Sequence, residues 1–482
     1  MVFSSTVFLC VFLPLVLFCY YIAPGKWAKN IILLLFSLVF YGWGEPSLVI
    51  LMVVSILANY LFGIMIHSCH NNGTKGLLPL VLSVIFNIGL LFYFKYFTFA
   101  QETIAALTGA DWVIKEIALP IGISFYTFQG LSYVIDVYRE DISDPTKIMV
   151  QKNPIKVALY ISMFPQLIAG PIVRYEDILP YLDKRKHSFS QFAEGIEVFI
   201  IGLAKKVIFA NMLGEVATSL METNIDMIGT GHAWLGAICY TMQIFYDFSG
   251  YSEMAIGLGK MFGFEFMQNF NFPYISRTIT EFWRRWHISL SGWFRDYLYI
   301  PLGGNRRGNV YFNLFVVFLA TGIWHGAAWG FIIWGLWHGV FMLAERILKK
   351  HTTFRLPSFI GSALGWAYTM LVVILGWVLF RIVDLPDTLD YIKLMFGIGN
   401  PEFVRYGVLY YLNKRTLAVL IAAIICCIPW KSIVRKHFPS ASKLSENTLF
   451  VLIRRIILLV LFVISFMLIT NSTYNPFIYF RF

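Results

Sequence analysis

Thr321-Gly-Ile-Trp-His-Gly326 is followed by Ala-Ala-Trp-Gly-Phe-Ile-Ile and then by Trp334-Gly-Leu-Trp-His-Gly339, so two Trp-His-Gly steps lie in one very apolar stretch. Burying a histidine ring without a hydrogen-bond partner costs about 1–3 kcal/mol. Ionisable residues inside membrane segments usually face a bundle interior or a water-filled cavity. A neutral imidazole can also take a proton from a hydroxyl group near pH 7. The stretch therefore predicts a membrane segment that carries a buried base.

The composition of the whole chain agrees with a membrane protein. The 482 residues are 58% hydrophobic and 13% charged, and the mean hydropathy is +0.69. Soluble domains have about 45–50% apolar and about 25% charged residues. We therefore predict an all-α polytopic membrane protein whose main surrounding partner is the lipid bilayer. The net charge of +11 is typical of cytoplasmic loops rich in Lys and Arg, and we expect no nucleic-acid partner.

Hydropathy along the chain predicts many helices. A membrane crossing needs about 20 apolar residues, and two of the candidates are short. We expect about 11 transmembrane helices, with the other segments re-entrant or interfacial, in one domain over residues 1–482. Residues 7–23 lack a basic segment before them and are interpreted as a first helix, not as a cleaved signal. The candidates are 4–23, 31–43, 47–67, 77–99, 118–137, 154–173, 191–211, 230–248, 310–325, 329–347, 359–382, 415–430 and 450–471.

The cysteines give no indication of metal binding. None of the six forms a C-x-x-C pair or a zinc-site spacing with histidine, and small hydrophobic packing is the usual role of such residues. There is also no G-x-x-x-x-G-K-[ST], H-E-x-x-H or G-x-S-x-G motif. We therefore expect no metal site and no permanently bound cofactor.

The segment 273–308 interrupts the apolar pattern with six arginines against two acidic residues. Basic and aromatic residues together indicate a membrane–water interface, and the excess of arginine favours the cytoplasmic side. Thr278 or Thr280 is expected to cap a helix with Glu281 in its first turn, and the helix is expected to run to about Tyr299. Other basic clusters include Lys26 with Lys29, and residues 184–186. The first pair fits an N-terminus outside the cytoplasm.

His325 is the first catalytic candidate, because glycines at 322 and 326 allow a substrate or another backbone to approach closely. A buried histidine bonded to a neighbouring helix is the alternative. His338 lies 13 residues further on, which is about 220° around a continuous helix. On such a helix His338 would face away and be structural, whereas a break at 327–330 would remove this restriction.

His287 follows two tryptophans and two arginines in Phe282-Trp-Arg-Arg-Trp286. Trp283 and His287 are i and i+4, so one continuous helix would place them on the same face. Arg284 and Arg285 would point elsewhere and could meet phosphates. An interfacial aromatic belt with lipid-facing arginines is the alternative interpretation.

Polar residues also lie within the apolar spans, mainly at 243–253 and 124–136. So much polarity inside a membrane suggests a wet tunnel through a thick bundle. Packing in which these groups hydrogen-bond to one another is the alternative.

Together these segments resemble the membrane-bound O-acyltransferase family, in its bacterial alginate O-acetylation branch. The resemblance covers about 119–340. It is carried, in order, by Leu119-Pro-Ile-Gly-Ile-Ser-Phe-Tyr-Thr-Phe-Gln-Gly130, Gly170-Pro-Ile-Val-Arg-Tyr175, Tyr246-Asp-Phe-Ser-Gly-Tyr-Ser252, Asn271-Phe-Pro-Tyr-Ile-Ser276, Phe282-Trp-Arg-Arg-Trp-His287, Arg295-Asp-Tyr-Leu-Tyr-Ile-Pro-Leu-Gly-Gly-Asn-Arg306 and Gly322-Ile-Trp-His-Gly-Ala-Ala-Trp329.

The resemblance implies helices around a central tunnel in a bacterial inner membrane. A thioester donor, most simply acetyl-CoA, would enter from the cytoplasm. The acceptor would be an exported polysaccharide or a periplasmic hydrolase-like acyltransferase. His325 would be catalytic, as base or as nucleophile, and His287 would be the second active-site residue. From their position and chemistry, we expect the donor to be held by Trp283, Arg284, Arg285, Arg306 and Arg307.

Two other functions fit parts of the pattern. D-alanyl transfer to teichoic acid from a carrier protein would use the same reaction type, but it would need a cytoplasmic surface that docks a protein. A transporter is the alternative from another class. Transporters often show inverted repeats and paired broken helices, and neither is visible in this sequence.

Overall fold

The computed structural model describes residues 1–482 except 110–112, 145–147, 169, 352–357, 400–402, 438–446, 472–473, 476–477 and 479–482. Across these described residues the regular structure is helical and no strand is present. The chain divides into two compact units, Met1–Ile196 with Ala255–Met267 and Glu197–Met254 with Gln268–Phe482. The expectation of one domain over the whole chain stays a prediction.

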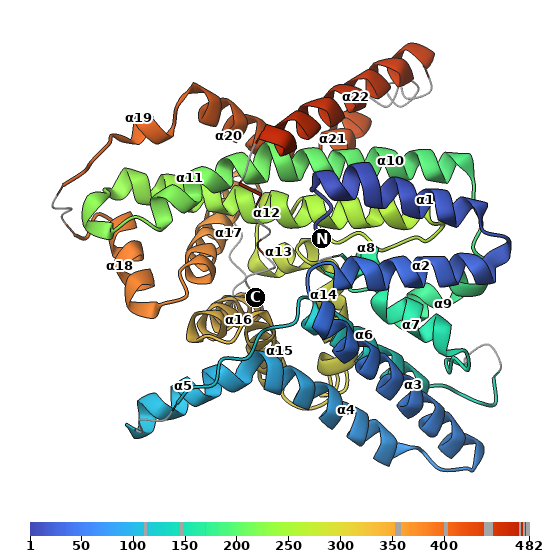
Figure 1. The fold of residues 1–482 in the computed structure, drawn as a ribbon. Helices are drawn as coiled ribbons and strands as arrows, with labels where there is room; N and C mark the ends of the chain where they lie inside the picture. The colour runs from blue at the N-terminus through green and yellow to red at the C-terminus, as the bar shows by residue number, and fades with distance from the viewer. Residues whose placement is uncertain are drawn as a thin grey trace. The chain divides into compact units, whose positions relative to one another are not determined.

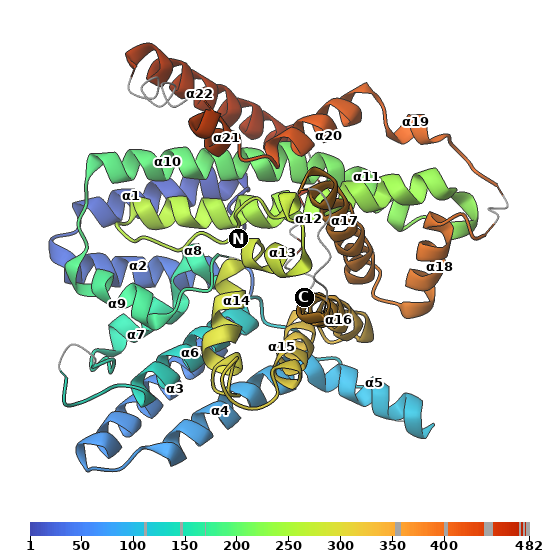
Figure 2. The same ribbon diagram turned by 180° about the vertical axis from the view of Figure 1, so that it is seen from behind.

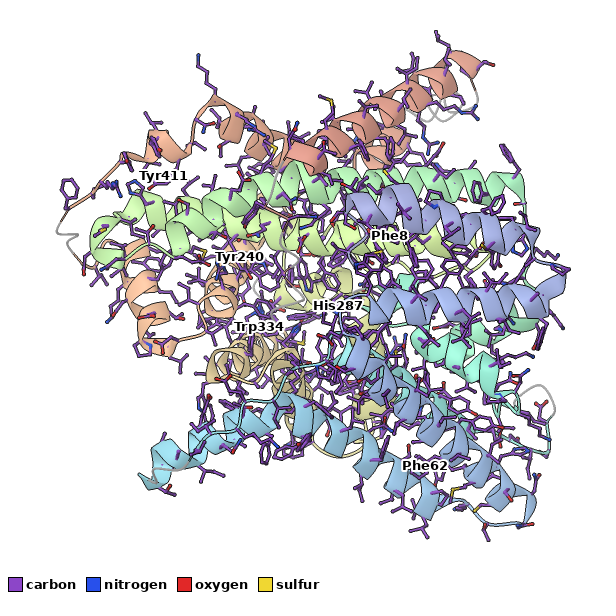
Figure 3. The ribbon with its side chains drawn as sticks, viewed as in Figure 1. Phe8, Phe62, Tyr240, His287, Trp334 and Tyr411 are labelled. Atoms are coloured by element: carbon purple, nitrogen blue, oxygen red, sulfur yellow. The ribbon has the colours of Figure 1, made fainter. Side chains whose placement is uncertain are left out.

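The first unit is a set of long helices packed through aromatic side chains. In it α3, α4 and α6 pack side by side, as do α1 and α2 (Figure 1). Phe8, which Figure 3 labels, lies 6.0 Å from Phe40 and 6.3 Å from Phe164, measured between ring centroids. Its elements are η1 (Phe8–Phe12), α1 (Leu13–Ile22), α2 (Gly25–Gly42), η2 (Pro46–Leu48), α3 (Val49–Asn71), α4 (Leu77–Leu91), η3 (Phe92–Tyr96), α5 (Phe97–Thr108), α6 (Ile123–Tyr138), α7 (Pro154–Ser162), α8 (Phe164–Leu167), α9 (Tyr175–Lys184) and the start of α10 (Phe189–Ala204).

The second unit carries the Trp-His-Gly steps on α15 and α16, which lie side by side (Figure 2). Most of α12 (Thr230–Met261) also belongs to it. The other elements are η5 (Lys205–Asn211), α11 (Met212–Met221), η6 (Ile225–Met227), η7 (Pro273–Ile275), α13 (Ile279–Arg285), α14 (Ile288–Phe294), η8 (Arg295–Tyr299), α15 (Val310–His325), α16 (Trp329–His351), α17 (Ser358–Arg381), α18 (Leu385–Met395), α19 (Val408–Tyr411), α20 (Lys414–Cys426), α21 (Trp430–His437) and α22 (Thr448–Asn471).

Several helices are long and apolar enough to cross a membrane. In the part of the chain that the structure describes there are 5, or up to 6 if the bent pair α20–α21 is one span. Phe8–Ile22 and Val310–His325 are shorter apolar helices. The count of about 11 crossings is therefore not confirmed, while the all-helical, membrane-integral class is.

Two expected helices are divided. The first helix of the expected span 154–173 ends at Ser162, because Met163 has a non-helical ψ of 114°, and α8 then begins at Phe164 with Pro165 in its first turn. Proline is well suited to a first helical turn, where its missing N–H would have no helical partner. The expected helix that starts at Thr278 or Thr280 and runs to about Tyr299 is divided as well, at Trp286 and His287, and this division shapes the site described next.

Candidate active site

The start of α13 is fixed by two side chains. Thr278, one of the two caps that the sequence predicted, caps the helix, and its hydroxyl accepts a hydrogen bond from the backbone N–H of Glu281 at 3.0 Å. Glu345 of α16 accepts from the backbone N–H of Ile279 at 2.5 Å and from that of Thr280 at 3.0 Å. A carboxylate at a helix N-terminus stabilises it and satisfies otherwise unpaired donors. The aromatic segment is thereby attached to α16.

The helix ends at Arg285 because Trp286 is extended, with ψ 130°, and His287 then adopts a left-handed backbone conformation, with φ 44° and ψ 55°. Such a conformation is uncommon for a residue other than glycine and is often found at functional sites. Asn269 stabilises the break, because its backbone carbonyl accepts from Ile288 N at 2.9 Å and its side-chain Oδ1 accepts from Ser289 N at 3.2 Å. The expectation that Trp283 and His287 share one face of a continuous helix is therefore wrong.

The hydrogen bonds of Asn269 also define the protonation of His287. Oδ1 of Asn269 must be an oxygen, because the backbone N–H of Ser289 donates to it. Nδ1 of His287 lies 3.2 Å from the same oxygen, so Nδ1 carries the proton. Nε2 then has a lone pair, and it has no hydrogen-bond partner among the described residues. His287 lies outside the membrane-spanning helices, and burial lowers its pKa to about 3. The side chain is a neutral imidazole whose Nε2 can accept a hydrogen bond.

His325 is the last residue of α15 and is 5% exposed. Residues 326–328 are not helical, and α16 returns along α15. The two helices approach closely at glycines: a Cβ on Gly322 would lie 2.6 Å from the carbonyl oxygen of Phe331. A Cβ on Gly335 would lie 2.5 Å from that of Phe318. The Trp-His-Gly steps therefore lie on two adjacent helices and not on one.

Aromatic rings connect three histidines within this unit. The ring centroid of His325 lies 5.0 Å from Trp324 and 4.8 Å from Trp334. Trp334 is 5.3 Å from His338, and Trp324 is 6.2 Å from His287. Figure 3 labels His287, between α13 and α14, and Trp334 on α16. These rings shield the imidazoles from solvent, which strengthens electrostatic interactions with a bound substrate.

His338 was expected to face away from His325 only if one continuous helix carried both. The helix breaks after His325, and the rings of His325 and His338 both contact Trp334. His338 is fully buried, and neither ring nitrogen has a hydrogen-bond partner in the described part of the chain. A Cβ on Gly376 of α17 would lie 2.8 Å from Nε2 of His338. His338 is therefore packed tightly inside the aromatic cluster.

A pocket of about 270 Å³ adjoins this cluster through Trp283, whose ring centroid lies 5.2 Å from that of His338, whereas neither His325 nor His287 lines it. Trp283 and Arg284, two of the residues expected to hold the donor, line it. Arg285 instead forms an ion pair with Glu281 at 2.9 Å. Arg306 and Arg307 are exposed in the segment between η8 and α15. The other lining residues are Thr280, Leu290, Ser291, Phe294, Arg295, Tyr299, Leu314, Val317, Phe318, Thr321 and Met342.

Polar groups on the central helix α12 are partly paired. Asp247 forms an ion pair with Lys206 at 2.6 Å, and the hydroxyl of Tyr246 donates to the carbonyl oxygen of Ala423 at 2.5 Å. Oε1 of Gln243 and the hydroxyls of Ser249 and Ser252 have no partner among the described residues. Mutual bonding thus accounts for part of this polarity, and the remaining groups have hydrogen-bonding capacity for water or substrate.

Sequence reasoning missed Asn269, Glu345 and Gly376, each of which acts through contacts distant in the sequence. The only local indication for Asn269 was its position two residues before the segment 271–276, which carries part of the family resemblance. No group of three or more His, Cys, Asp or Glu residues that could hold a metal ion occurs among the described residues. We assign no metal centre.

Comparison with known proteins gives one family. Residues 38–382 match the model of MBOAT, the membrane-bound O-acyltransferase family. The chain is 40% identical to the probable alginate O-acetylase AlgI of Pseudomonas putida, over 100% of both chains. It is 32% identical to a peptidoglycan O-acetyltransferase of Helicobacter pylori, over 100% of this chain and 98% of that one. A teichoic acid D-alanyltransferase of Bacillus subtilis is 32% identical over 48% of this chain and 60% of its own.

Proposed function

Because the chain belongs to the membrane-bound O-acyltransferase family, we propose that it passes an acetyl group from a cytoplasmic thioester across the membrane to hydroxyl groups of an exported polysaccharide. The observation that carries this proposal is the similarity to a probable alginate O-acetylase over the whole length of both chains. The peptidoglycan O-acetyltransferase relative supports the same reaction on another cell-envelope polymer.

In the proposed mechanism His325 takes the proton from the acceptor hydroxyl. The oxygen attacks the thioester carbonyl, the carbon–sulfur bond breaks and the thiol leaves with the proton that His325 took. In the alternative mechanism the imidazole nitrogen of His325 attacks the thioester carbonyl first, the carbon–sulfur bond breaks and the thiol leaves. The acceptor hydroxyl then attacks the acetyl-imidazole, loses its proton and releases the histidine. His287 supports either course, because its unprotonated Nε2 can accept a hydrogen bond from the reacting group.

The donor is proposed to be acetyl-CoA, held at the pocket that Trp283 and Arg284 line. Arginine suits phosphate because its planar guanidinium makes paired hydrogen bonds. Arg285, Arg306 and Arg307 would add positive charge near this entrance. Arg285 contributes less in this scheme, because Glu281 already pairs with it.

The surroundings of the enzyme are part of the proposal. We place it in the bacterial inner membrane, with residues 273–308 toward the cytoplasm, about 11 crossings and a central tunnel. The short apolar helices Phe8–Ile22 and Val310–His325 support a larger number of crossings than length alone gives. A periplasmic hydrolase-like acyltransferase would complete transfer to the polymer.

The D-alanyl alternative is weaker, because the teichoic acid relative matches less than half of this chain. The transporter alternative is set aside, since the family and its named relatives are acyltransferases.

The test is acyl transfer by the purified full-length chain in liposomes, with acetyl-CoA labelled in the acetyl group. Labelled acetate should become covalently bound to the protein or to added polysaccharide, and His325→Ala should abolish this transfer. His437→Ala is the matched control, because His437 is exposed and bonds only within its own helix α21. Transfer from a D-alanyl carrier protein but not from acetyl-CoA would reject the proposal.

A further inference from the structure

A second group of basic residues lies in the first unit, and the mechanism above does not use it. Lys26 and Lys29 lie in the first turns of α2, and Arg185 and His187 follow α9. The hydroxyl of Tyr20 connects these segments, because it donates to the carbonyl oxygen of Phe262 at 2.8 Å and lies 2.9 Å from Nε2 of His187. The sequence singled out both basic clusters, and the structure brings them together.

Arg185 is the central residue of this group and is only 4% exposed. Its Nη2 donates to the side-chain oxygen of Asn30. Its guanidinium carbon lies 4.5 Å from the ring centroid of Phe264 and 5.8 Å from that of Tyr20. Nε and Nη1 have no hydrogen-bond partner among the described residues. Two donor atoms of a buried cation are therefore unsatisfied, which is unusual because such groups are normally paired.

No described carboxylate forms an ion pair with Arg185. The nearest acidic neighbour along the chain, Asp183, is instead paired with Lys156 at 2.5 Å and is half exposed. Burial lowers the pKa of Arg185, with a smaller opposing effect from Tyr20 and Asp183. The pKa of His187 is also lowered, first by burial and then by the positive charges of Lys29, Arg185 and Lys26. The group thus carries an excess of positive charge without an internal anion.

We infer that Arg185, Lys29 and Lys26 form a binding site for a phosphate group. Nε and Nη1 are closed to solvent in this structure, so Arg185 would turn to present these unsatisfied donors to a phosphate oxygen. Lys29 would turn from the ring of Tyr20, 5.2 Å away, toward the same anion. Charge-assisted hydrogen bonds from arginine to phosphate are roughly twice as strong as neutral ones and are often bidentate. Basic residues beside apolar helices are also typical of sites for anionic lipid head groups.

The phosphate has two sources, a membrane phospholipid or a soluble phosphate compound, and binding experiments distinguish them. Purified, delipidated full-length protein is titrated with phosphatidylglycerol, with coenzyme A and with inorganic phosphate, and binding is measured by native mass spectrometry. Arg185→Gln should weaken the tightest binding about tenfold or more, the usual size of a lost charged hydrogen bond. Lys184→Gln is the matched control, since it removes the same charge from an exposed neighbour and should change binding little.

Each outcome gives an answer. Tight binding of phosphatidylglycerol that depends on Arg185 and resists competition by coenzyme A identifies a lipid site. Competition by coenzyme A or inorganic phosphate identifies a soluble ligand. Equal losses in both variants, or no loss in either, overturn the inference. If Arg185→Gln does not accumulate, hydrogen exchange of the wild-type protein is measured with and without the phosphate ligand instead. The ligand should protect the backbone of residues 184–187, and unchanged exchange in this segment rejects the site.

Discussion

Replacing Asn269 by Asp tests whether the neutral state of His287 is needed for transfer. Asp keeps the acceptor oxygen for Ser289 and for Nδ1 of His287, but it adds a negative charge 3.2 Å from that nitrogen. At an effective dielectric constant of about 20, two unit charges at this distance attract by about 5 kcal/mol. This corresponds to about four pKa units.

The shift will be smaller than this figure, because the carboxylate is itself buried and loses hydration. We expect the pKa of His287 to rise from about 3 by roughly two to four units. The protonated, inactive fraction then grows as the pH falls, so an acidic limb appears between about pH 5 and pH 7. In the wild-type protein this group remains neutral throughout that range.

The assay is the initial rate of acetyl transfer in liposomes from pH 5 to pH 8.5, at equal amounts of folded protein. Asn309→Asp is the matched control, since Asn309 caps α15 through its side-chain oxygen and Asp caps equally well. Its pH profile should follow that of the wild type. If the Asn269→Asp profile also coincides with the wild-type profile, the protonation of His287 does not control the reaction.

Three further predictions follow from particular contacts. Gly376→Ala places a methyl group 2.8 Å from Nε2 of His338 and should cost about 1–3 kcal/mol of stability. In the control Gly292→Ala the added methyl group meets nothing within 4 Å, so the Tm should be unchanged or raised, and equal effects of the two substitutions would contradict the reasoning. Arg284→Gln should raise the KM for acetyl-CoA several-fold with little change in kcat, and an unchanged KM would remove the donor from this pocket. Cysteine in place of Arg306 should react only with a membrane-permeant reagent in intact cells, so labelling by an impermeant reagent would reverse the topology.

Hydropathy and local capping predicted several elements closely. The expected span 310–325 coincides with α15, because Asn309 caps its start and the chain leaves the helix after His325. Thr278 was one of two expected caps and is the one that the structure uses. Local signals succeed here because both helix ends are determined by residues adjacent in sequence.

The break at His287 was not predicted, since neither glycine nor proline marks it. It is stabilised by Asn269, 18 residues away, and only the fold brings the two together. The number of membrane crossings is difficult to predict from the sequence for a related reason. Polar side chains on α12 are buried in protein, as the Lys206–Asp247 pair shows, and hydropathy alone does not distinguish burial in protein from burial in lipid.

The close contact of α15 and α16 has a consequence for how this enzyme can diversify. Backbone glycines, and not bulky side chains, determine the spacing of the two helices at Gly322 and Gly335. Side chains on the pocket wall, such as Leu314, Val317 and Met342, can therefore change size without moving the helix that ends in His325. If the donor binds in this pocket as proposed, mutations that alter donor preference are then separable from mutations that damage the reaction centre. Under that division a lineage can change its donor preference step by step without first losing the geometry of the reaction centre.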